Sequence, residues 1–177
     1  VGATLTNGGE TTHQGLEVGL RGDTASPFRG GDRLFARMAY TLLPTASFSG
    51  TRFSSVPGFS NVSVSGNRLP YAPEHSGSLV TGYRFGARAE AFAELVYVSS
   101  QFADDLNTIA GTADGQRGIL APSVTWNAGV NVYVLAHRLQ LFAAAYNLRN
   151  ALHIVDRSRG IVPSPPRRIQ TGVRLAF

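Results

Sequence analysis

A period of two runs through most of this chain and constrains its fold more than any other feature. From Val124 to Val134 every second residue is apolar, and the residues between them are small, polar or aromatic. Strict alternation of this kind predicts a β-strand with one apolar and one polar face. The segment from Ala87 to Tyr97 repeats the pattern, and its polar face carries Arg88, Glu90, Phe92 and Glu94. The fold class is therefore expected to be all-β.

Seven such strands are expected, near residues 11–22, 33–48, 69–85, 88–103, 122–135, 137–150 and 167–177. Most are longer than the strands of globular proteins, which usually have about 5 to 6 residues. Long strands with alternating faces are typical of a tilted bilayer crossing. Tight connections alternate with long ones, as in outer-membrane barrels: 83–86 and 135–138 are tight, whereas 49–68, 104–121 and 156–166 are long. The connection 22–32 is longer than this pattern predicts.

Composition excludes other classes of protein. The 177 residues are 43% hydrophobic, so the chain is not intrinsically disordered. Its longest apolar run, 141–146, is far shorter than the roughly 20 residues of a membrane-spanning helix. The absence of cysteine excludes a disulfide scaffold and a thiolate metal site. The net charge of +5 comes from scattered arginines without a compact block, which disfavours nucleic-acid binding.

No catalytic motif is present, and we expect neither an enzyme nor a cofactor. The sequence has no nucleophile elbow, zincin helix, Walker loop or dinucleotide-binding glycine set. The four histidines lie far apart in sequence, at positions 13, 75, 137 and 153, and are expected to be structural, with no metal site. The adjacent Asp104 and Asp105 are expected to be solvated loop charges, with a cation site as the alternative.

The C-terminus carries a further pattern. The last strand ends with a polar residue, a glycine, an apolar residue and a final aromatic at Gln170, Gly172, Leu175 and Phe177. This pattern resembles the β-signal by which the barrel-assembly machinery takes up bacterial outer-membrane proteins. A final strand with an apolar face and a free edge can add to a partner sheet. An ordinary last strand that happens to end in phenylalanine is the alternative.

Several segments together resemble TonB-dependent receptors, in family order along the whole chain. Residues 6–17 resemble the family's N-x-G…G-x-E strand, and residues 66–75, GNRLPYAPEH, resemble its GNRLPYAPxH segment. Residues 97–107 and 113–118 are similar to the ferric dicitrate receptor branch. Residues 160–167, GIVPSPPR, resemble the loop before the last strand. Leu148 and Arg149 depart from the family, which usually has an aromatic residue after the leucine.

The resemblance implies that residues 1–177 are the C-terminal part of a 22-stranded antiparallel transmembrane β-barrel, about its last third. The family's N-terminal plug domain and TonB box have no counterpart here. The implied function is active transport of an iron chelate, of the ferric siderophore or ferric citrate type, across the bacterial outer membrane. The implied partners are the TonB complex, the ferric chelate, outer-membrane lipid with its lipopolysaccharide, and the barrel-assembly machinery.

Two groups of charged residues are candidates for roles in that function. Arg88, Glu90 and Glu94 are expected to face the lumen, because a charge is costly in lipid near the midplane, by ~2–4 kcal/mol for an arginine. Loop arginines could hold an anionic chelate through their fork-shaped donors: Arg52, Arg117, Arg157 and Arg159. Lipopolysaccharide phosphates or plain solvation are alternatives for these arginines.

Two other functions stay open from the sequence. A self-contained outer-membrane barrel of eight strands, acting as an anchor, adhesin or lipid enzyme, would fit the length but not the odd strand count. A soluble β-barrel or sandwich that binds small ligands is disfavoured by the long strands with one continuous apolar face.

Overall fold

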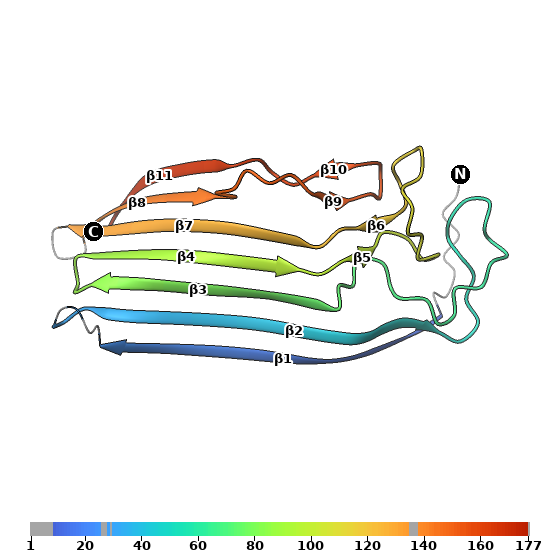
Figure 1. Ribbon diagram of the computed structural model, residues 1–177, viewed down its shortest axis with the longest axis horizontal. Helices are drawn as coiled ribbons and strands as arrows, with labels where there is room; N and C mark the ends of the chain where they lie inside the picture. The colour runs from blue at the N-terminus through green and yellow to red at the C-terminus, as the bar shows by residue number, and fades with distance from the viewer. Residues whose placement is uncertain (1–8, 26–27, 29, 135–137, 177) are drawn as a thin grey trace.

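The computed structural model describes residues 9–25, 28, 30–134 and 138–176. Seven strands form one antiparallel sheet in chain order (Figure 1): β1 (Glu10–Ala25), β2 (Arg33–Ser49), β3 (His75–Phe85), β4 (Ala89–Val98), β7 (Ser123–Val134), β8 (Leu139–Tyr146) and β11 (Arg168–Leu175). The loops add two short pairs: β5 (Gln101–Phe102) with β6 (Ile119–Leu120), and β9 (Ile154–Asp156) with β10 (Val162–Pro163). No helix in the described part of the chain is long and apolar enough to cross a membrane.

The prediction of seven long strands is confirmed, with differences at several strand ends; β1, for example, runs on to Ala25, and β8 ends at Tyr146, four residues before the expected end. Residues 69–74 precede β3 and belong to a loop, whereas the sequence pattern placed them in the strand. Pro70 and Pro73 cannot donate to a ladder, and Tyr71 adopts a left-handed backbone with φ of 55°. β4 ends at Val98, and the residues after it form β5 in the loop region.

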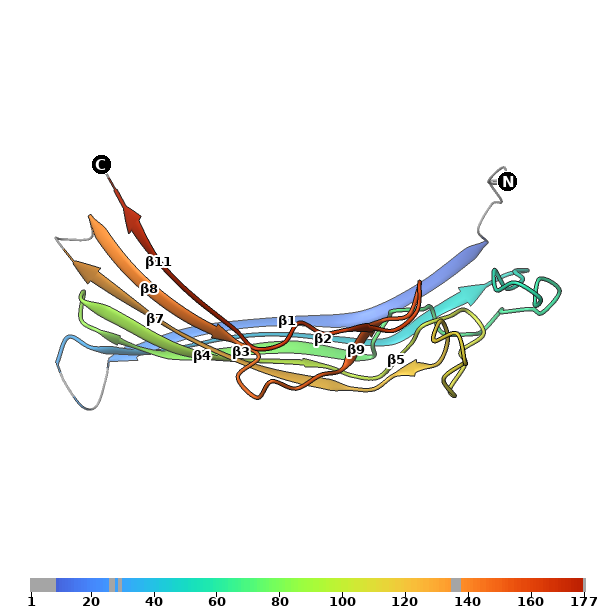
Figure 2. The ribbon, with the colours of Figure 1, turned by 90° about the horizontal axis from the view of Figure 1, so that it is seen from above.

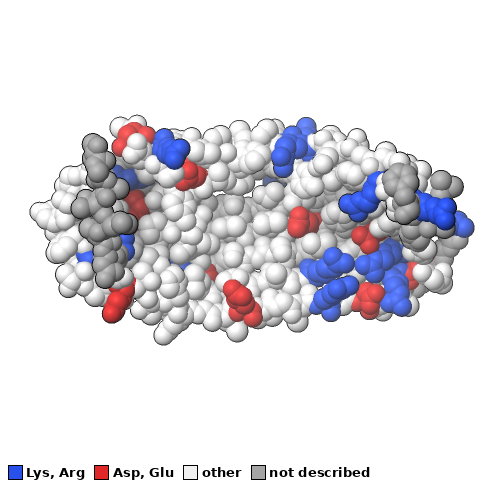
Figure 3. Space-filling model, turned by 180° about the vertical axis from the view of Figure 1, so that it is seen from behind, with Lys and Arg blue, Asp and Glu red and all other residues white. Residues whose placement is uncertain are grey.

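The two faces of the sheet differ in chemistry. On β7 the side chains of Val124, Trp126, Val130 and Val132 are 38–40% exposed, although all are apolar. The alternate residues of the strands carry the charged and amide side chains. The sheet is strongly bent (Figure 2), and charged side chains are spread over its concave face (Figure 3). A convex apolar face and a concave polar face are what a barrel wall presents to lipid and lumen.

Phenylalanines on the concave face lie against glycines of the neighbouring strand. Phe92 is in register with Gly129, and its ring lies 2.6 Å from where a β-carbon of Gly129 would be. Phe35 covers Gly82 in the same way, and Phe142 covers Gly172. The glycines leave room for the phenylalanine rings to lie along the sheet, so the side chains on this face project little into the space above it.

The sheet is open within the described residues. β1 and β11 are its two edges, and neither pairs with the other. Six antiparallel pairings separate these edges, so β1 and β11 run in the same direction. Direct pairing between them would be parallel, unlike the antiparallel closure of outer-membrane barrels.

Candidate functional site

Three loops, 50–74, 99–122 and 147–167, gather at one end of the sheet (Figure 1) and hold most of the chain's buried side chains. Ala46 and Phe48 at the end of β2, Val64 in the first loop and Leu120 in β6 are at most 5% exposed. Polar residues are buried beside them: Ser54, Asp104, Asp105, Asn147, Arg157 and Ser164. The loop end is therefore a small packed structure of its own.

Asp105 ties the second loop to the first. Its carboxylate accepts hydrogen bonds from the Ser54 hydroxyl at 2.6 Å, and from the amide and hydroxyl of Ser55 at 2.7 and 2.8 Å. Burial alone would raise the pKa of this carboxyl, but the bonds from Ser54 and Ser55 outweigh burial and hold it below its ordinary value. Asp105 is therefore a charged crosslink between two loops.

Asp104 organises its own loop. One oxygen accepts from the Leu106 amide at 3.0 Å and from the Thr108 hydroxyl at 2.9 Å, and the other faces the Gly118 amide at 3.5 Å. The expectation of solvated loop charges is wrong for both aspartates, because their side chains are buried and hydrogen-bonded. No group of three or more potential metal ligands occurs among the described residues.

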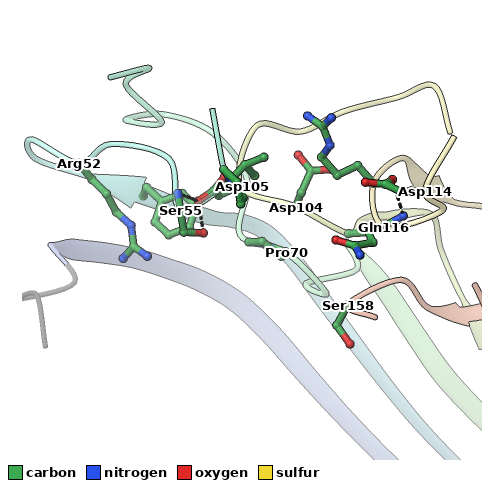
Figure 4. A pocket seen from close by; sticks show the side chains of 13 residues that line it. Arg52, Ser55, Pro70, Asp104, Asp105, Asp114, Gln116 and Ser158 are labelled. Carbon is green, nitrogen blue, oxygen red and sulfur yellow. Dashed lines mark hydrogen bonds between the residues drawn. The ribbon is translucent and has the colours of Figure 1, made fainter. Parts of the chain in front are cut away.

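A cavity of about 450 Å³ opens between these loops (Figure 4). Its lining includes Phe48, Arg52, Asp104, Asp105, Asp114 and Arg117. The structure thus brings together two of the four loop arginines singled out in the sequence. The Arg52 guanidinium lies 4.3 Å from the centre of the Phe48 ring, and that of Arg117 lies 5.2 Å from the Phe59 ring. Both cations are held against aromatic faces at the cavity.

The other two loop arginines differ from each other. Arg157 is only 8% exposed, and its guanidinium donates to the Gly115 carbonyl at 3.0 Å, so it joins the third loop to the second. Arg159 is exposed. Neither residue lines the cavity that holds Arg52 and Arg117.

Tyr71 is a second junction between loops that the sequence did not single out. Its hydroxyl donates to Asp156 at 2.7 Å and accepts from the Arg157 amide at 3.1 Å. Bonds from Ser158 and then from Tyr71 hold the pKa of Asp156 at about 2. Tyr71 lies between two prolines in the GNRLPYAPEH segment. These prolines are the feature of the sequence that indicates a loop of fixed conformation at this position.

Arg68 and Asn147 are further loop residues that sequence reasoning missed. The Arg68 guanidinium donates to the carbonyls of Leu43, Pro44 and Ala72 at 2.6–3.1 Å. The Asn147 amide donates to the carbonyls of Ala151 and Pro165 at 2.9 and 3.0 Å. Both side chains hold loop backbone in place through hydrogen bonds to its carbonyl groups. No local spacing in the sequence indicates these partners.

The charged residues expected in the lumen fall into two places. Glu90 and Glu94 lie on the concave face of β4, where Glu90 accepts from Arg84 at 2.8 Å and Glu94 from Asn127 at 2.7 Å. Arg88 belongs to the tight turn before β4, where its amide donates to the Phe85 carbonyl at 3.1 Å. Arg88 therefore marks the end of the sheet rather than the middle of a strand face.

The C-terminal pattern lies on the edge strand. Gln170 and Gly172 belong to β11 and share its concave parity, whereas Leu175 lies on the opposite parity. The ring of Phe142 occupies the space beside Gly172. Phe177 falls outside the described residues.

Comparison with known proteins agrees with this architecture. A family model for the TonB-dependent receptor-like β-barrel matches residues 1–148. The ferric citrate transporter FecA in its unliganded form superposes with a TM-score of 0.66 at 23% identity, over 92% of this chain and 24% of FecA. The siderophore receptor PiuA from Acinetobacter baumannii gives 0.66 at 20% identity, over 93% and 21%. The ferric-catecholate import receptor Fiu from E. coli K12, in its closed form, gives 0.60 at 18%, over 93% and 21%.

The present chain spans about a quarter of the length of these solved structures, and at this identity their likeness shows the fold alone. The match to the family model covers most of the chain and is independent of that likeness. The chain therefore belongs to the TonB-dependent receptor-like β-barrel family, whose members are outer-membrane transporters of Gram-negative bacteria and not enzymes.

Proposed function

We propose that residues 1–177 are the C-terminal barrel part of a longer receptor that imports an iron chelate of the ferric siderophore or ferric citrate type. The observation that carries this proposal is the loop cavity with Arg52 and Arg117, which lies at one end of a barrel sheet. The names of the similar structures, a ferric citrate transporter and two siderophore or catecholate receptors, support the substrate class. In the longer protein, a plug domain and the TonB complex supply gating and energy.

The cavity arginines provide the chemistry for an anionic chelate. A guanidinium presents several N–H donors in one plane, and it binds carboxylates in a bidentate manner. Phe48 and Phe59 orient the two guanidiniums, which reduces the entropy lost when the ligand binds. Arg157 contributes indirectly from the third loop, by holding the second loop in place, and Arg159 is exposed outside the cavity.

The proposed site is tested in the protein as expressed from its own gene in the outer membrane. The double variant Arg52→Gln/Arg117→Gln should weaken binding of ferric citrate about tenfold or more, because charge-assisted hydrogen bonds contribute ~1.5–3 kcal/mol each. Arg149→Gln, an exposed arginine beside β8, is the matched control. Unchanged affinity in the double variant would remove these arginines from the site.

The C-terminal pattern is proposed as the signal for the barrel-assembly machinery. Deletion of Phe177 should lower the yield of folded receptor in the outer membrane and leave unfolded chains in the periplasm, as membrane fractionation would measure. Phe177→Tyr keeps an aromatic terminus and serves as the control. Normal yield of the deletion variant would show that the terminal aromatic is not needed for assembly.

Lipopolysaccharide is the remaining proposed partner, at the convex side of the loop end. A self-contained small barrel receives no support from the described sheet, because its two edges run in the same direction. The receptor function therefore remains the proposal that fits both the sheet and the loop cavity.

A further inference from the structure

The concave face has an excess of positive charge at the end of the sheet opposite the loops. Basic side chains gather there in Figure 3, with a few acidic ones among them. The group consists of Arg21 on β1, Arg33 and Arg37 on β2, and Arg84 on β3, with the carboxylates of Asp23 and Glu90. Four positive charges against two negative ones leave two in excess.

Two of the arginines are paired with carboxylates. Arg33 contacts Asp23 at 2.9 Å, and Arg84 contacts Glu90 at 2.8 Å and Asp23 at 3.8 Å. These contacts use both of the carboxylates in the group. Arg21 and Arg37 form no ion pair within the described part of the chain.

Arg21 and Arg37 lie directly opposite each other in the register of β1 and β2. Opposite residues on one face of an antiparallel pair have β-carbons about 4.5–5.5 Å apart, and like charges there are destabilising. Two further carboxylates on this face are more distant: Glu17 lies four residues from Arg21 along β1, and Glu94 lies two strands from Arg37 across Val80 and already accepts from Asn127. Asp23 lies two residues from Arg21 on the same face of β1, but its carboxylate is already engaged by Arg33 and Arg84, so the Arg21–Arg37 pair has no ion-pair partner of its own within the described sheet.

The space beside this pair is shaped to take an anion. A cavity of about 250 Å³ is lined by Arg21, Asp23, Phe35, Arg37 and Arg84. The buried ring of Phe35 on β2 lies against Gly82 of β3. The Arg37 guanidinium lies 5.5 Å and the Arg84 guanidinium 4.8 Å from the centre of this ring. The aromatic ring holds both guanidiniums in position. The Arg84 guanidinium is already engaged by Glu90 and Asp23, whereas Arg37 forms no ion pair within the described residues.

We infer that Arg21 and Arg37 form a carboxylate-binding site on the concave face, distinct from the loop cavity. One carboxylate between the two guanidiniums converts a repulsive cross-strand pair into a bridged one. Its source is either an acidic side chain of a polypeptide segment that lies inside the barrel or a small carboxylate in the lumen. The two sources share the same chemistry and differ in whether the carboxylate can exchange with solvent. The inference depends on the strand register and not on which chelate is imported.

The inference is tested by whether the substitution Arg21→Gln raises or lowers the midpoint of thermal unfolding. The measurement uses the purified protein as expressed from its gene, in detergent at low ionic strength. If a carboxylate bridges the pair, Arg21→Gln lowers the midpoint of thermal unfolding. If the pair is empty, the same substitution relieves repulsion and raises the midpoint, which would overturn the site. Arg21 makes no ring contact in the described structure, so its loss reports on charge; Arg21→Lys should keep most of the wild-type midpoint.

Addition of succinate at constant ionic strength separates the two sources. A midpoint that rises with succinate in the wild type but not in Arg21→Gln indicates a free carboxylate site. A midpoint insensitive to succinate, together with destabilised Arg21→Gln, indicates a carboxylate supplied by the polypeptide. Arg174→Gln, on the concave face of β11 with a hydrogen bond to Gln140, is the matched control and should change little. If Arg21→Gln behaves like this control under all conditions, the site does not exist.

Discussion

The sheet and the loop end of this protein bury their residues in opposite ways. Phe35 is the one large side chain of the described sheet wall that is buried outside the loop end, whereas the loop end buries Phe48, Val64 and Leu120 together with several polar groups. The sheet exposes apolar side chains on its convex face, and the loops join through hydrogen bonds between side chains and backbone. The sheet depends on lipid and on the contents of the lumen, whereas the loop end packs against itself.

This difference has a consequence for mutation. In the sheet, the cost of a substitution depends on which face it changes, because the two faces meet different surroundings. In the loops, the cost depends on how many partners a side chain joins, since polar crosslinks replace a hydrophobic core. Substitutions in the two regions should therefore change the stability by different amounts and with different pH dependence. Their effects should also extend over different parts of the molecule.

The largest effect is expected on the convex face of β7. Val130→Arg in the membrane-embedded protein should destabilise it by ~2–4 kcal/mol, because the charge enters lipid near the midplane. Asn131→Arg, one position along on the concave face, should cost much less. Reversible urea unfolding in lipid vesicles measures both. Equal losses at the two positions would contradict the assignment of the faces.

A smaller loss is expected where a ring covers a glycine. Gly172→Ala should destabilise the sheet by ~1–3 kcal/mol, because the three atoms nearest to the added methyl group all belong to the ring of Phe142. Phe142→Leu in the same chain should recover part of the loss, and a double-mutant cycle measures the coupling. Additive effects would show that the contact is not what excludes a side chain at Gly172. The pair also separates packing from assembly, since a β-signal defect would not be rescued by Phe142→Leu.

The sequence predicted the sheet far better than the loop end. Alternation along residues 124–134 indicated the strand and its faces, because period two is a local property that lipid and lumen impose directly. The crosslinks from Asp105 to Ser54 and from Tyr71 to Asp156 join residues about 50 and 85 positions apart, and no local pattern encodes such partners. Arginine chemistry indicated Arg52 and Arg117, but only the fold shows that they share a cavity and that Arg157 does not.

In the loop end, Asp105→Asn should loosen the junction between the first two loops by ~1–2 kcal/mol, because an amide accepts fewer and weaker hydrogen bonds than a carboxylate. Hydrogen exchange at the Ser55 amide should accelerate, while exchange in β7 stays unchanged. The pKa of Asp105 is below its ordinary value, so its contribution is complete above about pH 4 and is lost as the pH falls through the folded-state pKa. Faster exchange throughout the sheet would mean that the loop end is not independent.

The smallest effect is expected at the exposed junction of Tyr71 and Asp156, where only the loops should respond. Tyr71→Phe removes the hydroxyl that donates to Asp156 and keeps the ring, so the pKa of Asp156 should rise from about 2 toward its ordinary value. Ser158, which also donates to Asp156, prevents a complete return. Because the folded-state pKa is depressed, the stabilising contribution of Asp156 is complete above about pH 4 and is lost as the pH falls toward 2.

Carboxyl chemical shifts of Asp156 across a pH titration measure the change, with Tyr133→Phe on the sheet as the control. A Tyr71→Phe variant that leaves the Asp156 titration unchanged would show that this bond does not hold the third loop, and the loop end would then rest on Asp105 and Arg157 alone.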